Sequence, residues 1–348
     1  MANDLIEALR AGDLARVRLA IRSDPQAAPR PRAICEAGGL AFQPAIELLV
    51  KHGADLNAAW RGYRPLHNLI QSGKPSPERL RCLEWMLEHG ADPEQTGAWP
   101  PARAVILAAF AGQPDYVKRL RKPGDAFAAA ALADQKLVQA ALRKRPDFAR
   151  ARDSGSLTAL QCAAGSRMPG PLHEIARLLI DAGADIHAKT RSWSQDIDAV
   201  YLAASAKNAA LFGLLLDRGA DATQALTPAL WNGSEELAGM ALAHGAVPDG
   251  ALAGGQPLLN NLIRWGQFRP ALWLLRQGAS PNLADQRGWT AVHQAASRGN
   301  ERMLRALLEA GGDLTRRDHE GCLPRDRATR HSLLAIMATT ESPAQLCN

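Results

Sequence analysis

The chain has 348 residues, of which 47% are hydrophobic and 22% are charged, and its formal net charge is +6. This length predicts either two globular domains or one elongated array, and the apolar share is large enough for a continuous core. Arginine and lysine alternate with aspartate and glutamate along the chain and form no long basic run, so we expect no nucleic-acid partner.

The cysteines and the N-terminus indicate the compartment. Five cysteines are widely spaced and never form a Cys-x-x-Cys pair, which argues against a disulfide framework and a thiolate zinc site. The N-terminus has no apolar signal region, and no stretch approaches 18 uninterrupted apolar residues. We therefore expect a cytoplasmic protein without a membrane span. The Ala- and Arg-rich composition is typical of a bacterial chain from a GC-rich genome.

The first third of the chain predicts short helices in pairs. The stretch NDLIEALRAGDLARVRLAI has helical spacing of its apolar residues and resembles the capping end of a repeat array. Pairs of predicted helices, here called units, follow it and are centred on Cys35, His67 and Ile106. The segment from Gly124, GDAFAAAALADQKLVQAALRKRPDFARARD, resembles the N-terminal cap again. We therefore expect a kink or seam near 121–126.

The remaining units are centred on Gln161, Tyr201, Thr227, Asn260 and His293, and a closing helix is expected between Cys322 and about Thr339. The predicted domains are accordingly an N-terminal sub-array (1–124), a C-terminal sub-array with its closing helix (125–339) and a frayed tail (340–348). Two units are irregular. The unit around Thr227 lacks a hairpin before its first helix, and the loop 187–198 is longer than the others.

A repeated turn decides the fold class. Strings such as KHGADLN, EHGADPE, DAGADIH and DRGADAT each follow an apolar helical pattern, and the intervals from Gly245 to Gly278 and from Gly278 to Gly311 are 33 residues each. Shorter helical patterns such as RPLHNLI, PLLNNLI and WTAVHQAA precede the apolar helices. The units resemble the ankyrin repeat, and GWTAVHQAASRGNERMLRALLEAGGDLTRRDHEG is the most typical copy. The resemblance implies an all-α solenoid of about ten helix-turn-helix units, in which neighbouring units share one core.

The same resemblance assigns positions within each unit. Asn260 takes the position of His in the family's Thr-Pro-Leu-His motif, like His67 and His293, where the side chain bridges units. Asn261 takes the next position, which the resemblance places on the concave groove, as it does Gln294. The predicted binding residues on the groove are Trp231, Asn232, Asn260, Asn261, Arg264, Trp265, Gln294 and Arg298, and Arg191 and Trp193 are added from the long loop. Indole rings and guanidinium groups are frequent binding anchors, and Arg also pairs with carboxylates.

Motifs for chemistry are missing from the sequence. There is no Gly-x-Gly-x-x-Gly, no phosphate loop, no His-Glu-x-x-His and no Gly-x-Ser-x-Gly. We expect no catalytic residue, metal or cofactor, and interpret the chain as a monomeric module that binds a protein or peptide with acidic groups. The alternative is an enzyme or small-molecule receptor with a site built in the concave groove.

Overall fold

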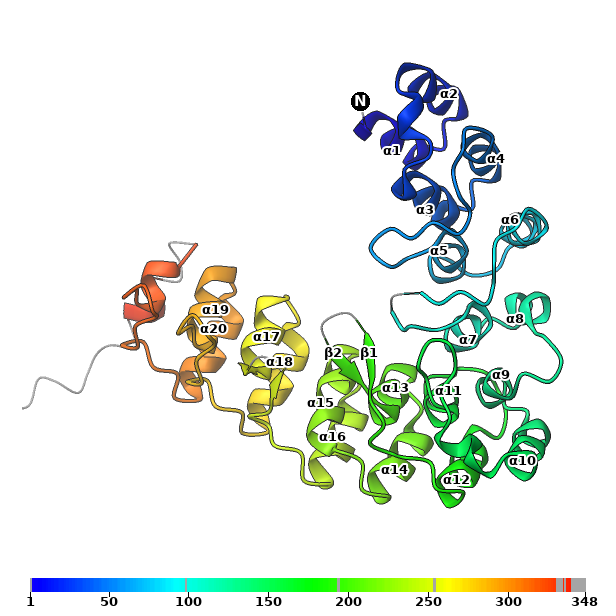
Figure 1. The fold of residues 1–348 in the computed structure, drawn as a ribbon. Coiled ribbons are helices and arrows are strands. Elements are labelled where there is room, and N and C mark those ends of the chain that lie inside the picture. Colours follow the sequence, from blue (N-terminus) through cyan, green and yellow to red (C-terminus); the bar gives the residue numbers. More distant parts are fainter. Residues whose placement is uncertain are drawn as a thin grey trace, which may run out of the picture. The chain divides into compact units, whose positions relative to one another are not determined.

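The computed structural model describes residues 2–97, 99–192, 195–252, 255–329, 334 and 336–338, and its chain forms two compact units, Met1–Leu215 and Leu216–Asn348 (Figure 1). Both units consist mainly of short helices, as the sequence predicts. The predicted seam at 121–126 lies within the first unit and stays a prediction. The predicted frayed tail lies outside the described residues.

The first unit contains pairs of helices joined by tight turns. Its helices are α1 (Ala2–Arg10), α2 (Leu14–Ser23), η1 (Pro25–Ala27), α3 (Pro31–Leu40), α4 (Gln43–Lys51), α5 (Pro65–Gln71), α6 (Pro77–Glu88), α7 (Ala104–Phe110), α8 (Pro114–Leu120), α9 (Ala126–Ala131), α10 (Gln135–Lys144), η2 (Pro146–Arg150), α11 (Ala159–Ala164), α12 (Leu172–Asp181), α13 (Ala199–Ala206) and α14 (Ala209–Asp217), whose last two residues lie beyond the boundary. The first helices of successive pairs, α3, α5, α7, α9, α11 and α13, pack side by side. Each therefore shares its core with its neighbours.

The second unit continues the same pattern. Its helices are α15 (Ala222–Trp231), α16 (Glu235–Ala243), α17 (Leu258–Arg264), α18 (Phe268–Arg276), α19 (Ala291–Arg298), α20 (Glu301–Glu309) and η3 (Pro324–Arg327). Helix α17 packs against α19, and α18 packs against α20. Part of the predicted closing helix is described, because residues 334 and 336–338 are helical.

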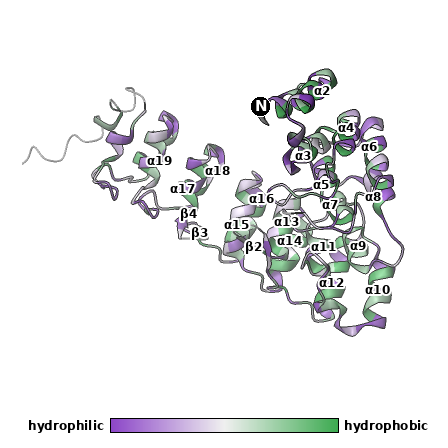
Figure 2. Cartoon of the chain, turned by 45° about the horizontal axis from the view of Figure 1, so that its top comes forward, coloured by the Kyte–Doolittle hydropathy of each residue, from purple (hydrophilic) through white to green (hydrophobic). Residues whose placement is uncertain are grey.

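The sequence explains where the helices begin and end. Gly278 and Gly311 follow α18 and α20 with φ of +91° and +83°, a left-handed conformation that glycine adopts without strain. At the other end, Thr158 caps α11 and Thr290 precedes α19, and each backbone N–H donates to the side chain three residues later, Gln161 or His293. Second helices such as α10 and α12 carry apolar residues on one side and polar residues on the other, and show both green and purple (Figure 2).

The hairpins between helix pairs, here called fingers, are held by buried aspartates. Asp153 accepts hydrogen bonds from the N–H groups of Gly155 and Leu157, each at 2.9 Å. Asp285 and Asp318 each accept from the N–H groups two and four residues later in the same way. One carboxylate thus closes each of these fingers from inside.

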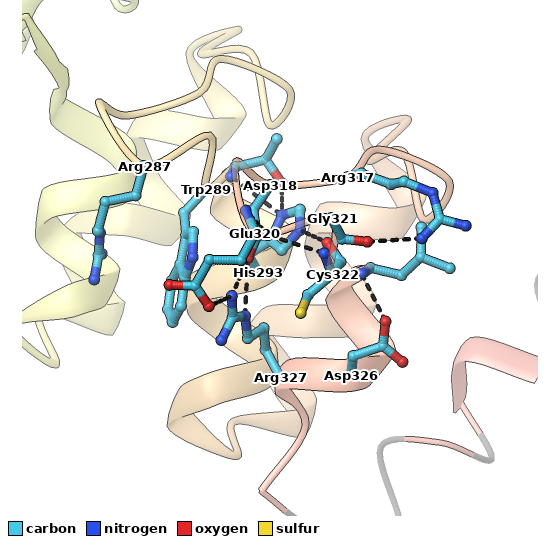
Figure 3. A network of polar contacts seen from close by, with 12 residues as sticks. Arg287, Trp289, His293, Arg317, Asp318, Glu320, Gly321, Cys322, Asp326 and Arg327 are labelled. Atoms are coloured by element: carbon cyan, nitrogen blue, oxygen red, sulfur yellow. Dashed lines mark hydrogen bonds and ion pairs between the residues drawn. The ribbon is translucent and has the colours of Figure 1, made fainter.

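The last finger carries a network of polar contacts (Figure 3). Arg327 donates to Asp318 at 2.5 Å and to Glu320 at 2.6 Å, and its guanidinium also lies 5.1 Å from the centre of the Trp289 ring. Arg287 lies on the other side of that ring, at 4.3 Å. The indole therefore packs between two cations and joins two fingers.

The structure shows the two irregular units that the sequence predicts, the long loop 187–198 and the unit around Thr227. The long loop forms the hairpin β1 (Thr190–Ser192) and β2 (Gln195–Ile197), with Arg191 opposite Asp196. A second, shorter hairpin pairs β3 (Ala251–Leu252) with β4 (Gln256–Pro257). No finger precedes α15, since residues 218–221 are its whole connection to α14 and Asp221 caps it directly.

Candidate functional site

The candidate site is built at the C-terminal ends of first helices in the second unit. Trp231, Arg264 and Arg298 are the last residues of α15, α17 and α19, and Trp265 follows α17 as its C-cap residue. Because equivalent positions in stacked repeats lie on the same side of an array, this register brings the side chains to one surface.

Arg264, Trp265 and Arg298 form one cluster. The guanidinium of Arg298 donates a hydrogen bond to the backbone carbonyl of Arg264, and the guanidinium of Arg264 lies 5.9 Å from the centre of the Trp265 ring. Trp265 is 61% exposed, the largest exposure of a tryptophan in the described part of the chain. No ion pair joins either arginine to a carboxylate within that part. The cluster thus presents an open indole beside two cations without an acidic partner.

Trp231 and Asn232 lie one repeat away. Trp231 is 36% exposed, and the side-chain amide of Asn232 donates to the carbonyl of Pro228 at 2.7 Å, so it caps its own helix. Among the described residues no hydrogen bond or ring contact joins this pair to the cluster.

The other predicted groove residues are buried. Asn260 is 2% exposed, Asn261 9% and Gln294 3%. The amide of Asn260 donates to the carbonyls of Leu283 and Trp289, at 3.0 and 2.8 Å, which is the bridging role that the sequence predicts.

Asn261 and Gln294 differ from the expectation that they face an open groove. Asn261 donates to Gln256 of β4 at 3.3 Å, and Gln294 donates to the finger carboxylate of Asp285 at 3.4 Å. Both amides are covered because a hairpin or finger folds over them. Neither amide is therefore open to a partner in this structure.

The predicted loop site is described in part. Arg191 is exposed on β1 and pairs with Asp196 at 3.2 Å, which leaves less of its charge for a partner. Trp193 lies outside the described residues.

The position that Asn260 takes in its repeat, here called the bridging position, holds more residue types in other repeats than the sequence predicts. His67 and His293 contact the carbonyls of Ala102 and Cys322, at 3.1 and 3.3 Å. Gln161 donates to the carbonyls of Ala188 and Ile197, and the thiol of Cys35 lies 3.3 Å from the carbonyl of Tyr63. Burial lowers the pKa of His67 to about 4, so its ring is neutral at pH 7. These groups are structural, because each joins one unit to the next finger.

Two hollows were not predicted. A shallow groove of about 1390 Å³ runs along α16, α18 and α20 and is lined by Phe268, Leu272 and Leu275 among alternating Arg and Glu residues. A smaller pocket of about 420 Å³ lies in the first unit, between Tyr63, Trp99, Phe110 and Arg167. Phe110 is the last residue of α7, the position that Trp231 holds in α15, so repeat register could have identified it.

No side-chain cluster in the described residues suits metal binding, since no group of three or more His, Cys, Asp or Glu side chains converges there. Within those same ranges, no helix is both long and apolar enough to cross a membrane.

Comparison with known families agrees with this repeat architecture. Residues 259–338 match a family model for three consecutive ankyrin repeats, and residues 156–191 match the single ankyrin repeat. The chain contains ankyrin repeats. The two matches cover the units that contain Gln161, Asn260 and His293, three of the bridging residues described above.

Ankyrin repeat proteins of several kinds are similar to parts of the chain. An ankyrin repeat-containing protein of Schizosaccharomyces pombe is 46% identical over 50 residues, which are 14% of this chain and 24% of the relative. Inversin of Gallus gallus is 37% identical over 76 residues, 21% of this chain and 7% of the relative. The chain thus spans less than a quarter of the length of these curated relatives.

A solved structure supports the fold. The crystal structure of the human ASB11 ankyrin repeat domain superposes with a TM-score of 0.51 at 20% identity, over 64% of this chain and 100% of that one. At this identity the likeness concerns the fold alone.

Proposed function

We propose that this ankyrin repeat protein is a non-catalytic binding module that holds an acidic segment of a protein partner against Arg264, Trp265 and Arg298. Ankyrin repeats are in general protein–protein interaction modules, and the curated relatives are repeat proteins too. Trp231 extends the proposed surface onto the neighbouring repeat.

The exposed indole of Trp265 beside two cations without a carboxylate carries this proposal. Exposed aromatic rings contribute most to binding when a partner buries them, and a guanidinium can bind a carboxylate through two parallel hydrogen bonds. Burying either arginine without an acidic group opposite would cost free energy, so the partner must supply negative charge.

Capture from a lysate of the native organism tests the proposal. The variant Arg264→Ala/Trp265→Ala is expected to lose the partner that wild type captures, with a change in Tm of no more than a few degrees, because both side chains are on the surface. Capture by wild type should weaken as salt is raised from about 50 to 300 mM.

Arg276→Ala/Gln277→Ala is the matched control. These residues end and cap α18 as Arg264 and Trp265 end and cap α17. Retention of the partner by the cluster variant, or its equal loss in the control, would contradict the assigned surface. A stoichiometric small molecule or metal in place of a protein would instead favour a receptor or enzyme.

A further inference from the structure

The pocket of the first unit has aromatic walls contributed by two successive repeats. Tyr63 belongs to the finger before α5, Trp99 to the next finger, and Phe110 ends α7. The amide of Gln71 donates to the carbonyl of Trp99 at 2.8 Å, so the end of α5 fixes the finger that carries the indole. On its outer side the Trp99 ring contacts Tyr201, with centroids 5.9 Å apart.

The floor of this pocket depends on Gly165. A Cβ added to Gly165 would lie 2.5 Å from Phe110 Cζ, so a larger residue at the end of α11 would displace the ring. Because Gly165 has no side chain, the Phe110 ring lies directly on that helix end. The pocket is open to solvent on one side, and its volume of about 420 Å³ is at the lower end of the range for ligand sites.

Arg167 supplies the polar part of the pocket. Its backbone N–H donates to the carbonyl of Ala109 at 3.0 Å, and one guanidinium nitrogen donates to the carbonyl of Ser205 at 2.7 Å. These bonds hold the side chain across the ends of α7 and α13. The side chain is exposed, so its remaining N–H groups can donate to a ligand.

The charge around the pocket is one-sided. Arg167 is the one charged side chain among the described residues that line the pocket, and the carboxylate of Asp198, which precedes α13, is not part of that lining. Asp198 is buried and accepts the N–H of Tyr201 at 2.8 Å as the cap of α13. A ligand that enters the pocket therefore meets positive charge at the rim and aromatic rings inside.

We propose that this pocket binds one large apolar side chain, of phenylalanine size, from an acidic segment of a protein partner. A carboxylate flanking that side chain would accept hydrogen bonds from Arg167. The inference rests on the proposed function as a protein-binding module, but it concerns residues of the first unit only. Packing of an aromatic side chain against Tyr63, Trp99 and Phe110 supplies affinity, and the charge around it selects acidic neighbours.

Peptide titration followed by NMR tests this assignment in the full chain. The probes are acetylated, amidated pentapeptides: Glu-Asp-Phe-Asp-Glu, its central Ala analogue, and Lys-Lys-Phe-Lys-Lys. The readout is the indole N–H resonance of Trp99, assigned with Trp99→Phe. We expect a saturable shift with the acidic Phe peptide and at least tenfold weaker binding of the other two.

Two variants locate the binding. Ala206→Phe fills the pocket from its rim at the end of α13 and should abolish the shift, whereas Ala11→Phe, in an exposed turn outside the pocket, should leave it unchanged. Arg167→Glu should weaken binding of the acidic peptide and strengthen that of the basic one. Because Arg167 is on the surface, this variant keeps the test meaningful if the filling variant does not fold.

The Trp265 indole resonance separates the two proposals in the same spectra. A shift of Trp265 without Trp99 would overturn this inference and leave the proposed function standing. A shift of Trp99 without Trp265 would support the inference and count against the cluster in the second unit. Equal binding of the Ala and Phe peptides, or the absence of a saturable Trp99 shift at millimolar peptide, would overturn the pocket assignment.

Discussion

Arg298 donates a hydrogen bond from its guanidinium to the backbone carbonyl of Arg264, so the last residue of α19 satisfies the end of α17. The final carbonyls of a helix have no partner within it, and a cation there is favourable. This bond also fixes the distance between two arginines that the proposed surface needs. The Arg298 side chain therefore has a structural role and a binding role. Measuring both the stability and the affinity of a substituted protein distinguishes the two.

Replacement of Arg298 should affect binding more than stability. We expect Arg298→Ala to reduce the free energy of unfolding by no more than about 1 kcal/mol, because the bond is exposed to solvent. Affinity for the partner should fall at least tenfold. Urea unfolding and a binding titration measure the two effects, and a stability loss of several kcal/mol with unchanged affinity would show that the role is structural only.

Asn260 should be replaceable by histidine but not by leucine. Asn260→Leu removes the donor to the carbonyls of Leu283 and Trp289, of which the Trp289 carbonyl keeps a bond from the N–H of Asp285 at 2.9 Å. The expected cost is about 1–3 kcal/mol. Asn260→His should recover most of that loss, since His293 fills the same position in the next repeat. Unfolding of both variants in urea checks this order; equal stability would mean that water satisfies the carbonyls.

Arg103 should be essential to the first unit. Its buried guanidinium donates to both carboxylate oxygens of Asp125, at 2.6 and 3.2 Å, and to Glu94 at 2.9 Å, and it lies 3.5 Å from Asp153. Burial raises the pKa of Asp153, whereas at Asp125 the bonds to Arg103 outweigh burial and lower the pKa. Removal of the cation would leave buried carboxylates uncompensated.

We therefore expect Arg103→Leu to lower the free energy of unfolding by about 3–5 kcal/mol. Arg121→Leu is the control, since Arg121 forms an exposed pair with Asp134 and should cost less than about 1 kcal/mol. Urea unfolding followed by circular dichroism compares the two. Similar losses in both variants would refute a special role for the buried network.

His67 should make stability depend on mildly acidic pH. Its pKa of about 4 in the folded chain is below the value of 6.5 for an unperturbed histidine, mainly because of burial. Between these values the unfolded chain binds a proton that the folded chain does not. Stability is therefore fully present above pH 6.5 and is lost as pH falls toward 4, by up to about 1.4 kcal/mol per pH unit.

His67→Asn should reduce this dependence, because asparagine fills the same position at Asn260 and does not titrate. Urea unfolding at pH 7 and pH 5 gives the two free energies for each protein. Burial also lowers the pKa of His293, so the variant should retain part of the slope. An unchanged difference between the two pH values would exclude His67 as the source.

Sequence reasoning predicted the repeat fold, the bridging role of Asn260 and the absence of a finger before α15, because each follows from a local pattern with a fixed period. It did not predict the burial of Asn261 and Gln294. Their positions in the repeat are correct, but Gln256 and Asp285 cover them, and such covering depends on the path of a neighbouring finger. The pocket at Phe110 was missed for a similar reason, since its lining comes from the separate repeats of α5, α7, α11 and α13.

The aspartates that close the fingers have a consequence for how such chains diversify. Asp153, Asp285 and Asp318 each hold a finger through bonds from backbone N–H groups, and those bonds do not depend on which side chains the tip carries. An exposed tip residue such as His319 can therefore be exchanged without reshaping the hairpin. The backbone atoms of a finger determine its fold, whereas the side chains at its tip contact a partner. A new binding specificity can therefore arise by substitution at the tips while the fold of the array stays the same.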